Sequence, residues 1–314
     1  MRTTRWIAAA VMLPLIAVLP ARAETFVNIL TGGQAGVYYP LGVALEKIFA
    51  EKMTDVRPSV QATKASVENL NLLQAGRGEI AFTLGDSLRD AYAGNAEVGF
   101  ARPLDKLRTI AAIYPNYIQI VASKESGITT LADLKGKRLS VGAPASGTEL
   151  NARAILGAAG ITYDDLGKVE YLPFAESVEL MKNRQIDATL QSAGLGVASL
   201  RDLANAVAIT VVEVPVDAVT SIGSPYAPGT IPAGTYQGQE ADVPTATVIN
   251  YLVTHSDVPE EAVYEMTKSI FESLPALAAA HAAANAIKLD AEALVSPAPL
   301  HPGAERYFKE QGLL

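Results

Sequence analysis

The stretch FVNILTGGQAGVYYPLGVALEKIF, residues 26–49, has the pattern of a strand, a glycine-rich loop and a helix. Residues 26–30 are a short apolar run with β-branched side chains, which is typical of a buried strand. From residue 38 onward, large apolar residues recur at the spacing of one helix face: Leu41, Leu45, Ile48 and Phe49. Strand, tight loop and helix together are the repeating unit of an α/β sheet, so this stretch predicts the fold class.

The same unit recurs along the chain. The sequence predicts strands at 56–62, 79–84, 107–114, 117–123, 137–143, 169–173, 186–192, 206–214 and 245–254. It predicts helices at 38–53, 66–76, 86–94, 130–136, 147–159, 175–184 and from 259 onward. This alternation predicts a parallel sheet with helices on both faces.

Two such units predict two lobes. We expect residues 24–112 plus 223–314 to form one lobe and residues 113–222 the other. The Pro- and Gly-rich stretch at 224–238 breaks the rhythm and predicts a return connection or a partner-facing loop. Two α/β lobes enclose a cleft, and ligands bind at the carboxyl ends of parallel strands.

Length and composition exclude several function classes. The chain has 314 residues, 49% hydrophobic and 18% charged, with a net charge of −8 and no cysteine. That length favours two domains, and the apolar content is enough for buried cores. An acidic chain without a clustered basic surface is a poor nucleic-acid binder. Without cysteine there is no disulfide, thiol catalysis, Cys-ligated metal or lipidated N-terminal cysteine.

The N-terminus has the pattern of a secretory signal peptide. Arg2 and Arg5 precede an apolar stretch at 6–19, and Ala21-Arg22-Ala23 forms a small-residue cleavage site. At ~1.5 Å per residue the apolar stretch spans roughly 21 Å, less than the ~30 Å of a bilayer core. We therefore expect residues 1–23 to be removed and the chain to be periplasmic. Cleavage lowers the basic count from 25 to 22 against 33 acidic residues, a net charge of −11.

The loop at 31–40, TGGQAGVYYP, is the first candidate ligand contact. It lacks the ending of a P-loop and the glycine spacing of a dinucleotide-binding loop. Its glycines let backbone N–H groups approach a ligand, and the helix start behind it favours negative charge. From this loop we predict contacts by Gly32, Gly33, Val37 and Tyr38. The alternative is a tight turn with no ligand.

Equivalent positions occur elsewhere in the chain. Ser146 and Glu149 have capping-box spacing, and the loop they define offers free N–H groups and a hydroxyl to a carboxylate. A capping role alone is the alternative. The further predicted contacts are Ser66, Asp86, Tyr114, Ser146, Gly147, Thr148, Ala193 and Gly194. Lys64 is a weaker candidate as an anion partner, and Asp86 either caps its helix or accepts from a ligand amine.

The sequence predicts no catalytic residue, metal site or cofactor. The three histidines match no metal-ligand spacing, and Ser146 lacks the preceding glycine of a nucleophile elbow. The rival hypothesis is an exported serine hydrolase with Ser146 as nucleophile and His255 or His281 as base.

Several quoted segments together resemble one family. TGGQAGVYYPLG, SVENLNLL, DSLRDAYAG, DLKGKRLSVGAPASGTELNARAIL, QIDATLQSAG, TIPAGTYQGQEADVPT and PLHPGAERYFKEQGL are similar to the TAXI family of TRAP-transporter-associated extracytoplasmic immunogenic proteins. The resemblance implies a two-lobe, type II-like periplasmic-binding-protein fold and a solute receptor. It implies a small organic anion as ligand (a dicarboxylate, a keto acid or an acidic amino acid), because known members are associated with glutamate and 2-oxoglutarate.

The resemblance also implies partners: a small and a large TRAP membrane subunit, either separate or fused. We expect a monomer, and a module that presents its ligand to a sensor kinase is a further alternative. Two positions depart from the family pattern. T-G-G-S is replaced here by Thr63-Lys64-Ala65-Ser66, and G-S-G-T by Ala145-Ser146-Gly147-Thr148.

Overall fold

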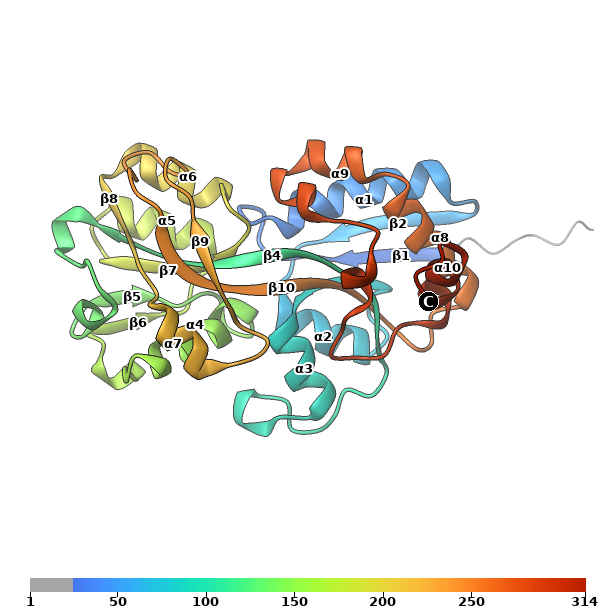
Figure 1. The fold of residues 1–314 in the computed structure, drawn as a ribbon, viewed down its shortest axis with the longest axis horizontal. Coiled ribbons are helices and arrows are strands. Elements are labelled where there is room, and N and C mark those ends of the chain that lie inside the picture. The colour runs from blue at the N-terminus through green and yellow to red at the C-terminus, as the bar shows by residue number, and fades with distance from the viewer. Residues whose placement is uncertain (1–24) are drawn as a thin grey trace, which may run out of the picture.

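The computed structural model describes residues 25–314, and their strands form one mixed sheet that runs the length of the molecule (Figure 1). The strands are β1 (Thr25–Leu30), β2 (Val56–Gln61), β3 (Ile80–Leu84), β4 (Leu107–Ser123), β5 (Arg138–Ser140), β6 (Lys168–Glu170), β7 (Ala188–Ala193), β8 (Ile209–Val212), β9 (Ala227–Ile231) and β10 (Val243–His255). Their order is β2-β1-β3-β10-β4-β7-β5-β6, with β8 beside β4 and β9 beside β10.

Helices follow most of these strands, as the alternating pattern predicts. They are α1 (Tyr38–Lys52), α2 (Ser66–Gln74), α3 (Gly85–Ala93), α4 (Gly147–Ala158), α5 (Phe174–Lys182), α6 (Ala198–Ala206), α7 (Val216–Ile222), α8 (Glu260–Phe271), α9 (Leu274–Ala280) and α10 (Pro302–Glu310). The apolar stripe predicted for residues 38–53 is buried in α1, where Leu41, Leu45 and Phe49 are in the core.

The sheet has two halves, joined by the long strands β4 and β10 (Figure 1). We call the part around β1, β2 and β3 the first half and the part around β5, β6 and β7 the second half. Within each half these strands pair in parallel, whereas β10 is antiparallel to both β3 and β4. The prediction of a wholly parallel sheet is therefore wrong at the centre of the molecule.

The predicted strands 107–114 and 117–123 are one continuous strand, β4. The sequence suggested a break because Pro115 has no N–H to donate to a ladder. In the structure Pro115 lies opposite Ile249 of β10, beside an irregularity in the pairing. A proline is tolerated at such a position, so the strand continues through it.

The second half contains more structure than predicted. The Pro- and Gly-rich stretch holds β9, which pairs with the beginning of β10 at Val243–Thr247. Beyond β9, Tyr236 is buried, and its hydroxyl bonds to the side chain of Gln119. This stretch is therefore an ordered part of the sheet and its packing.

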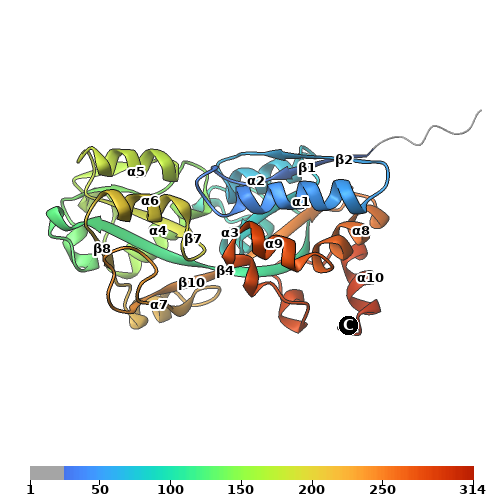
Figure 2. The ribbon, with the colours of Figure 1, turned by 90° about the horizontal axis from the view of Figure 1, so that it is seen from above.

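The last helices return to the first half. Figure 2 shows α9 beside α1, and α8 packs against both α1 and α10. In residues 25–314, no helix is both long and apolar enough to cross a membrane. The predicted signal peptide lies outside the described residues, and the lobe boundaries at 112/113 and 222/223 stay a prediction.

Candidate ligand-binding site

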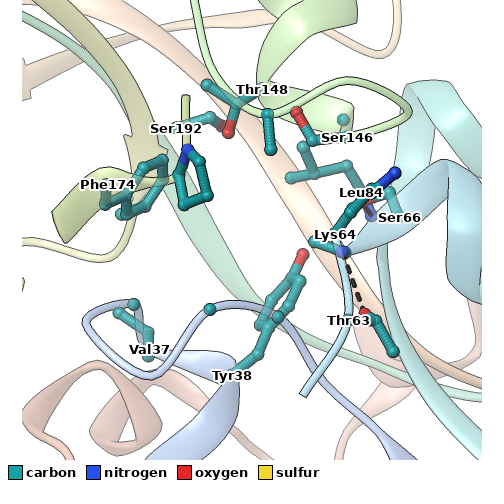
Figure 3. A pocket seen from close by; sticks show the side chains of 18 of the residues that line it. Val37, Tyr38, Thr63, Lys64, Ser66, Leu84, Ser146, Thr148, Phe174 and Ser192 are labelled. Carbon is teal, nitrogen blue, oxygen red and sulfur yellow. Dashed lines mark hydrogen bonds between the residues drawn. The ribbon is translucent and has the colours of Figure 1, made fainter. Parts of the chain in front are cut away.

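A pocket of about 120 Å³ lies between the two halves, where loops after several strands meet (Figure 3). That volume corresponds to roughly ten water-sized spheres, the scale of a small metabolite. Its lining residues are Gly32, Gly33, Gly36, Val37, Tyr38, Thr63, Lys64, Ala65, Ser66, Leu84, Asn116, Ala143, Ser146, Gly147, Thr148, Pro173, Phe174, Ser192 and Ala193.

Helix starts from both halves meet at this pocket. Helices α1 and α2 of the first half and α4 and α5 of the second each begin at a residue that lines it: Tyr38, Ser66, Gly147 and Phe174. The first N–H groups of a helix have no partner within the helix, and the helix dipole places partial positive charge there. The pocket is therefore suited to a small anion.

Hydroxyl groups add to these donors. Ser146 caps α4 by accepting from the Glu149 N–H at 3.1 Å, which leaves its own proton free to donate. Thr148 is only 7% exposed, and it also lines the pocket. Figure 3 shows Ser146 and Thr148 on the second-half side of the pocket, with Ser192 close by.

Tyr38 forms a fixed wall of the pocket. Its ring stacks on Phe82 with centroids 5.0 Å apart, and its hydroxyl donates to the side chain of Asn250 at 2.5 Å. Burial raises the pKa of the Tyr38 hydroxyl far above its ordinary value of 10.0, so the side chain is neutral at physiological pH.

Lys64 is the charged residue among the described residues that line the pocket. Its side chain is exposed, and it precedes the start of α2. Figure 3 shows Lys64 and Ser66 on one side of the pocket, with Val37 and Phe174 on the other. The cationic side chain and the two apolar side chains Val37 and Phe174 therefore lie on opposite sides of the site.

The halves touch directly at the rim of the pocket. The Glu68 N–H of α2 donates to the Ala145 carbonyl at 3.1 Å. Gly147 lies so close to Ser66 that a Cβ added to Gly147 would be 2.6 Å from the Ser66 hydroxyl oxygen. Any side chain at 147 would therefore force Ser66 and Leu84 to move. The two halves are therefore in direct contact beside the pocket.

Two alanines at positions that depart from the quoted TAXI pattern have a backbone conformation that glycine favours, whereas Lys64 is not among the residues with positive φ. Ala65 and Ala145 occupy positions where the pattern has glycine, and both have positive φ, 75° and 59°. The backbone conformation that glycine favours is thus kept, with a strained alanine in each loop.

Most predicted contacts lie together on this pocket: Gly32, Gly33, Val37, Tyr38, Ser66, Ser146, Gly147, Thr148 and Ala193. Three do not line it. Tyr114 is buried. A Cβ added to Gly194 would lie 3.7 Å from the Tyr114 ring and 2.7 Å from the Ala283 side chain. Both residues lie behind the pocket wall because neighbouring chain segments cover them.

Asp86 is the third predicted contact that lies away from the pocket. It is inside the first turn of α3 rather than at its N-cap, which is Leu84. Its carboxylate accepts from Tyr226 and from Asn151, both at 2.6 Å, so it joins the two halves instead of facing a ligand. Burial raises the pKa of the Asp86 carboxyl, and the hydrogen bond from Tyr226 acts in the opposite direction.

Some lining residues were missed by sequence reasoning. Pro173 and Phe174 follow β6, at the carboxyl end of that strand. Ligands bind at the carboxyl ends of parallel strands, so the same reasoning that selected Gly33 and Ser146 could have selected these two residues. Asn116 belongs to β4, and only the continuous strand brings it to the pocket.

The hydrolase hypothesis has no supporting geometry. No histidine of the described chain lines the pocket that contains Ser146. His281 instead accepts from the Ala283 N–H at 3.1 Å, and His255 is buried at the end of β10. Within residues 25–314 no cluster of three or more His, Cys, Asp or Glu is arranged to hold a metal ion.

Two α/β halves, joined by the two long strands β4 and β10, thus meet at a pocket that is lined by helix starts. The profile of the NMT1-like family matches residues 29–312, and the chain belongs to that family.

Solved structures share the fold. PhnD1 of Prochlorococcus marinus in complex with methylphosphonate superposes with a TM-score of 0.58 at 13% identity, covering 84% of this chain and 92% of that one. A binding protein component of an ABC phosphonate transporter from Pseudomonas aeruginosa gives 0.57 at 11% identity, with 84% and 80% covered. The alkanesulfonate-binding protein SsuA of Xanthomonas axonopodis pv. citri bound to MOPS gives 0.51 at 15% identity, with 92% and 85% covered.

Proposed function

We propose that this chain is a periplasmic solute receptor that binds a small organic anion between its halves and delivers it to a membrane transporter. The observation that carries the proposal is the convergence of four helix starts of the described chain on one pocket, which Lys64 also lines. Candidate ligands are dicarboxylates, keto acids and acidic amino acids. Local donors must attract the anion, because the chain itself carries a net charge of −8.

The transporter is proposed to be of the TRAP type. The quoted segments that resemble the TAXI family support this assignment, with a small and a large membrane subunit as partners. Closure of the halves would both enclose the ligand and form the surface that those subunits recognise. A membrane pull-down with and without ligand tests the partner: TRAP subunits should be recovered only with ligand, and recovery of a sensor kinase instead would contradict the assignment.

A thermal-shift screen tests ligand binding. The panel contains dicarboxylates, keto acids, amino acids and aromatic acids, with methylphosphonate and an alkanesulfonate added because similar structures are named for such ligands. A binder at 100 times its Kd stabilises the folded protein by ~2.7 kcal/mol, which raises the melting temperature by several degrees. If no small anion shifts the melting temperature, the proposal fails.

A double variant locates the site. Gly33→Val together with Ser146→Ala alters one lining residue of each half. The identified ligand should bind this variant more weakly than the parent, as measured by calorimetry. Equal affinity would show that the ligand binds elsewhere.

A further inference from the structure

The pocket offers many hydrogen-bond donors. The exposed ammonium of Lys64, the hydroxyls of Ser146, Thr148 and Ser192, and the first residues of four helices of the described chain all lie on its lining. A ligand that fills this space must therefore supply acceptors.

Seven acceptor oxygens of the lining already have a donor within the protein. Six backbone carbonyls of lining residues each accept from an internal donor: Gly33 from Gly36 N–H, Ala65 from Asn69 N–H, Ala143 from Ser146 N–H, Pro173 from Ser177 N–H, Ser192 from Asn116 Nδ2 and Ala193 from Gln119 Nε2. The side-chain oxygen of Asn116 accepts from Asn250 at 2.8 Å. These bonds leave few oxygens for a ligand that donates.

No carboxylate of the described residues lines the pocket. Three carboxylates on neighbouring helices accept from groups of the protein itself. Glu68 accepts from the Lys64 N–H at 2.5 Å, and Glu149 accepts from Arg153 at 2.7 Å. Asp86 accepts from Tyr226 and Asn151.

We propose that the pocket selects carboxylates that have no amine, such as 2-oxo acids, and rejects the corresponding α-amino acids. The inference rests on the proposed function and narrows it. An α-ammonium group carries three donors and no acceptor, and enclosing it without a carboxylate or free carbonyl leaves a desolvated charge unpaired. A pocket without an acceptor for the ammonium group therefore binds the amino acid much more weakly than the 2-oxo acid.

Matched ligand pairs test the proposal on the unmodified mature chain. Calorimetry at neutral pH compares pyruvate with alanine, 2-oxoisovalerate with valine, and 2-oxoglutarate with glutamate. In each pair that binds, the 2-oxo acid should bind more than tenfold tighter. A ratio of tenfold or less, or tighter binding by the amino acid, overturns the selectivity and leaves the proposed function standing. If no member of any pair binds while other anions in the screen do, the selectivity is likewise overturned. If no anion binds at all, the proposed function itself fails.

A substitution in the lining gives an independent readout. Ser192 is 5% exposed, and its carbonyl lies 2.8 Å from the Asn116 side-chain nitrogen. Ser192→Asp supplies a carboxylate that can pair with an ammonium group, whereas Ser192→Asn has nearly the same shape without the charge. The preference for the 2-oxo acid should shrink at least fivefold in S192D and persist in S192N, with melting curves confirming that both variants fold. An unchanged preference in folded S192D would contradict the inference.

Discussion

Removing the Tyr226 hydroxyl should weaken ligand binding without unfolding the protein. Tyr226 packs in the core of the second half, and its hydroxyl donates at 2.6 Å to Asp86 on α3 of the first half. The bond therefore exists only while the halves are together. Tyr226→Phe keeps the ring and its packing. It removes this contact across the two halves, together with the bond that the hydroxyl accepts from Asn151 at 2.8 Å within the second half.

The size of the effect follows from the chemistry of the bond. A hydrogen bond to a carboxylate contributes about 1.5–3 kcal/mol, and the Asp86 oxygen is buried. When the halves separate, water solvates both groups, so the loss falls on the closed state alone. At ~1.36 kcal/mol per tenfold, the Kd for the ligand should rise about 10- to 150-fold.

Calorimetric titration of parent and variant with the identified ligand measures this change. The matched control is Tyr163→Phe, because the Tyr163 hydroxyl donates to Glu149 at 3.0 Å and both residues belong to the second half. That control should lower the melting temperature slightly and leave the Kd unchanged. If Y226F binds ligand within twofold of the parent, Asp86 and Tyr226 do not stabilise the closed state.

Three further predictions concern the rim of the pocket. Gly147→Ala should raise the ligand Kd at least tenfold in calorimetry, since the new Cβ would lie 2.6 Å from the Ser66 hydroxyl; Gly157→Ala on the same helix has open space and should not. Lys64→Met should weaken ligand binding about fivefold at low salt, because an exposed ion pair contributes ~1 kcal/mol to the free energy of binding. If the effect is just as large in 1 M salt, Lys64 does not act through its charge. Ala65→Gly and Ala145→Gly should each raise the free energy of unfolding by about 1 kcal/mol, because glycine relieves the positive-φ strain; urea denaturation that shows a loss of stability would refute this account.

Local pattern was enough to predict the units of the fold. Residues 26–49 form β1, the loop and α1 as expected, because the apolar spacing of one strand and one helix is a local property. The ends of the predicted strands also indicated the loops that contain Gly33 and Ser146, and both residues line the same pocket in the structure. Their role in binding a ligand stays a prediction.

Contacts between distant segments could not be predicted in this way. Asp86 has the sequence context of a helix cap, but its partners Asn151 and Tyr226 are 65 and 140 residues away. The continuity of β4 through Pro115 depends on its pairing with β10, which no local pattern reveals. The antiparallel centre of the sheet was missed for the same reason.

The most direct test of the central claim is a crystal structure of the mature chain with the tightest ligand from the screen. A carboxylate of the ligand should lie within hydrogen-bonding distance of the N–H groups of Gly147 and Thr148 or of the Thr148 hydroxyl, with the rest of the ligand between Phe174 and Tyr38. A ligand that binds outside this pocket would contradict the proposed site. An example is the cavity lined by Ile249 of β10 and by Lys288 of the segment after α9.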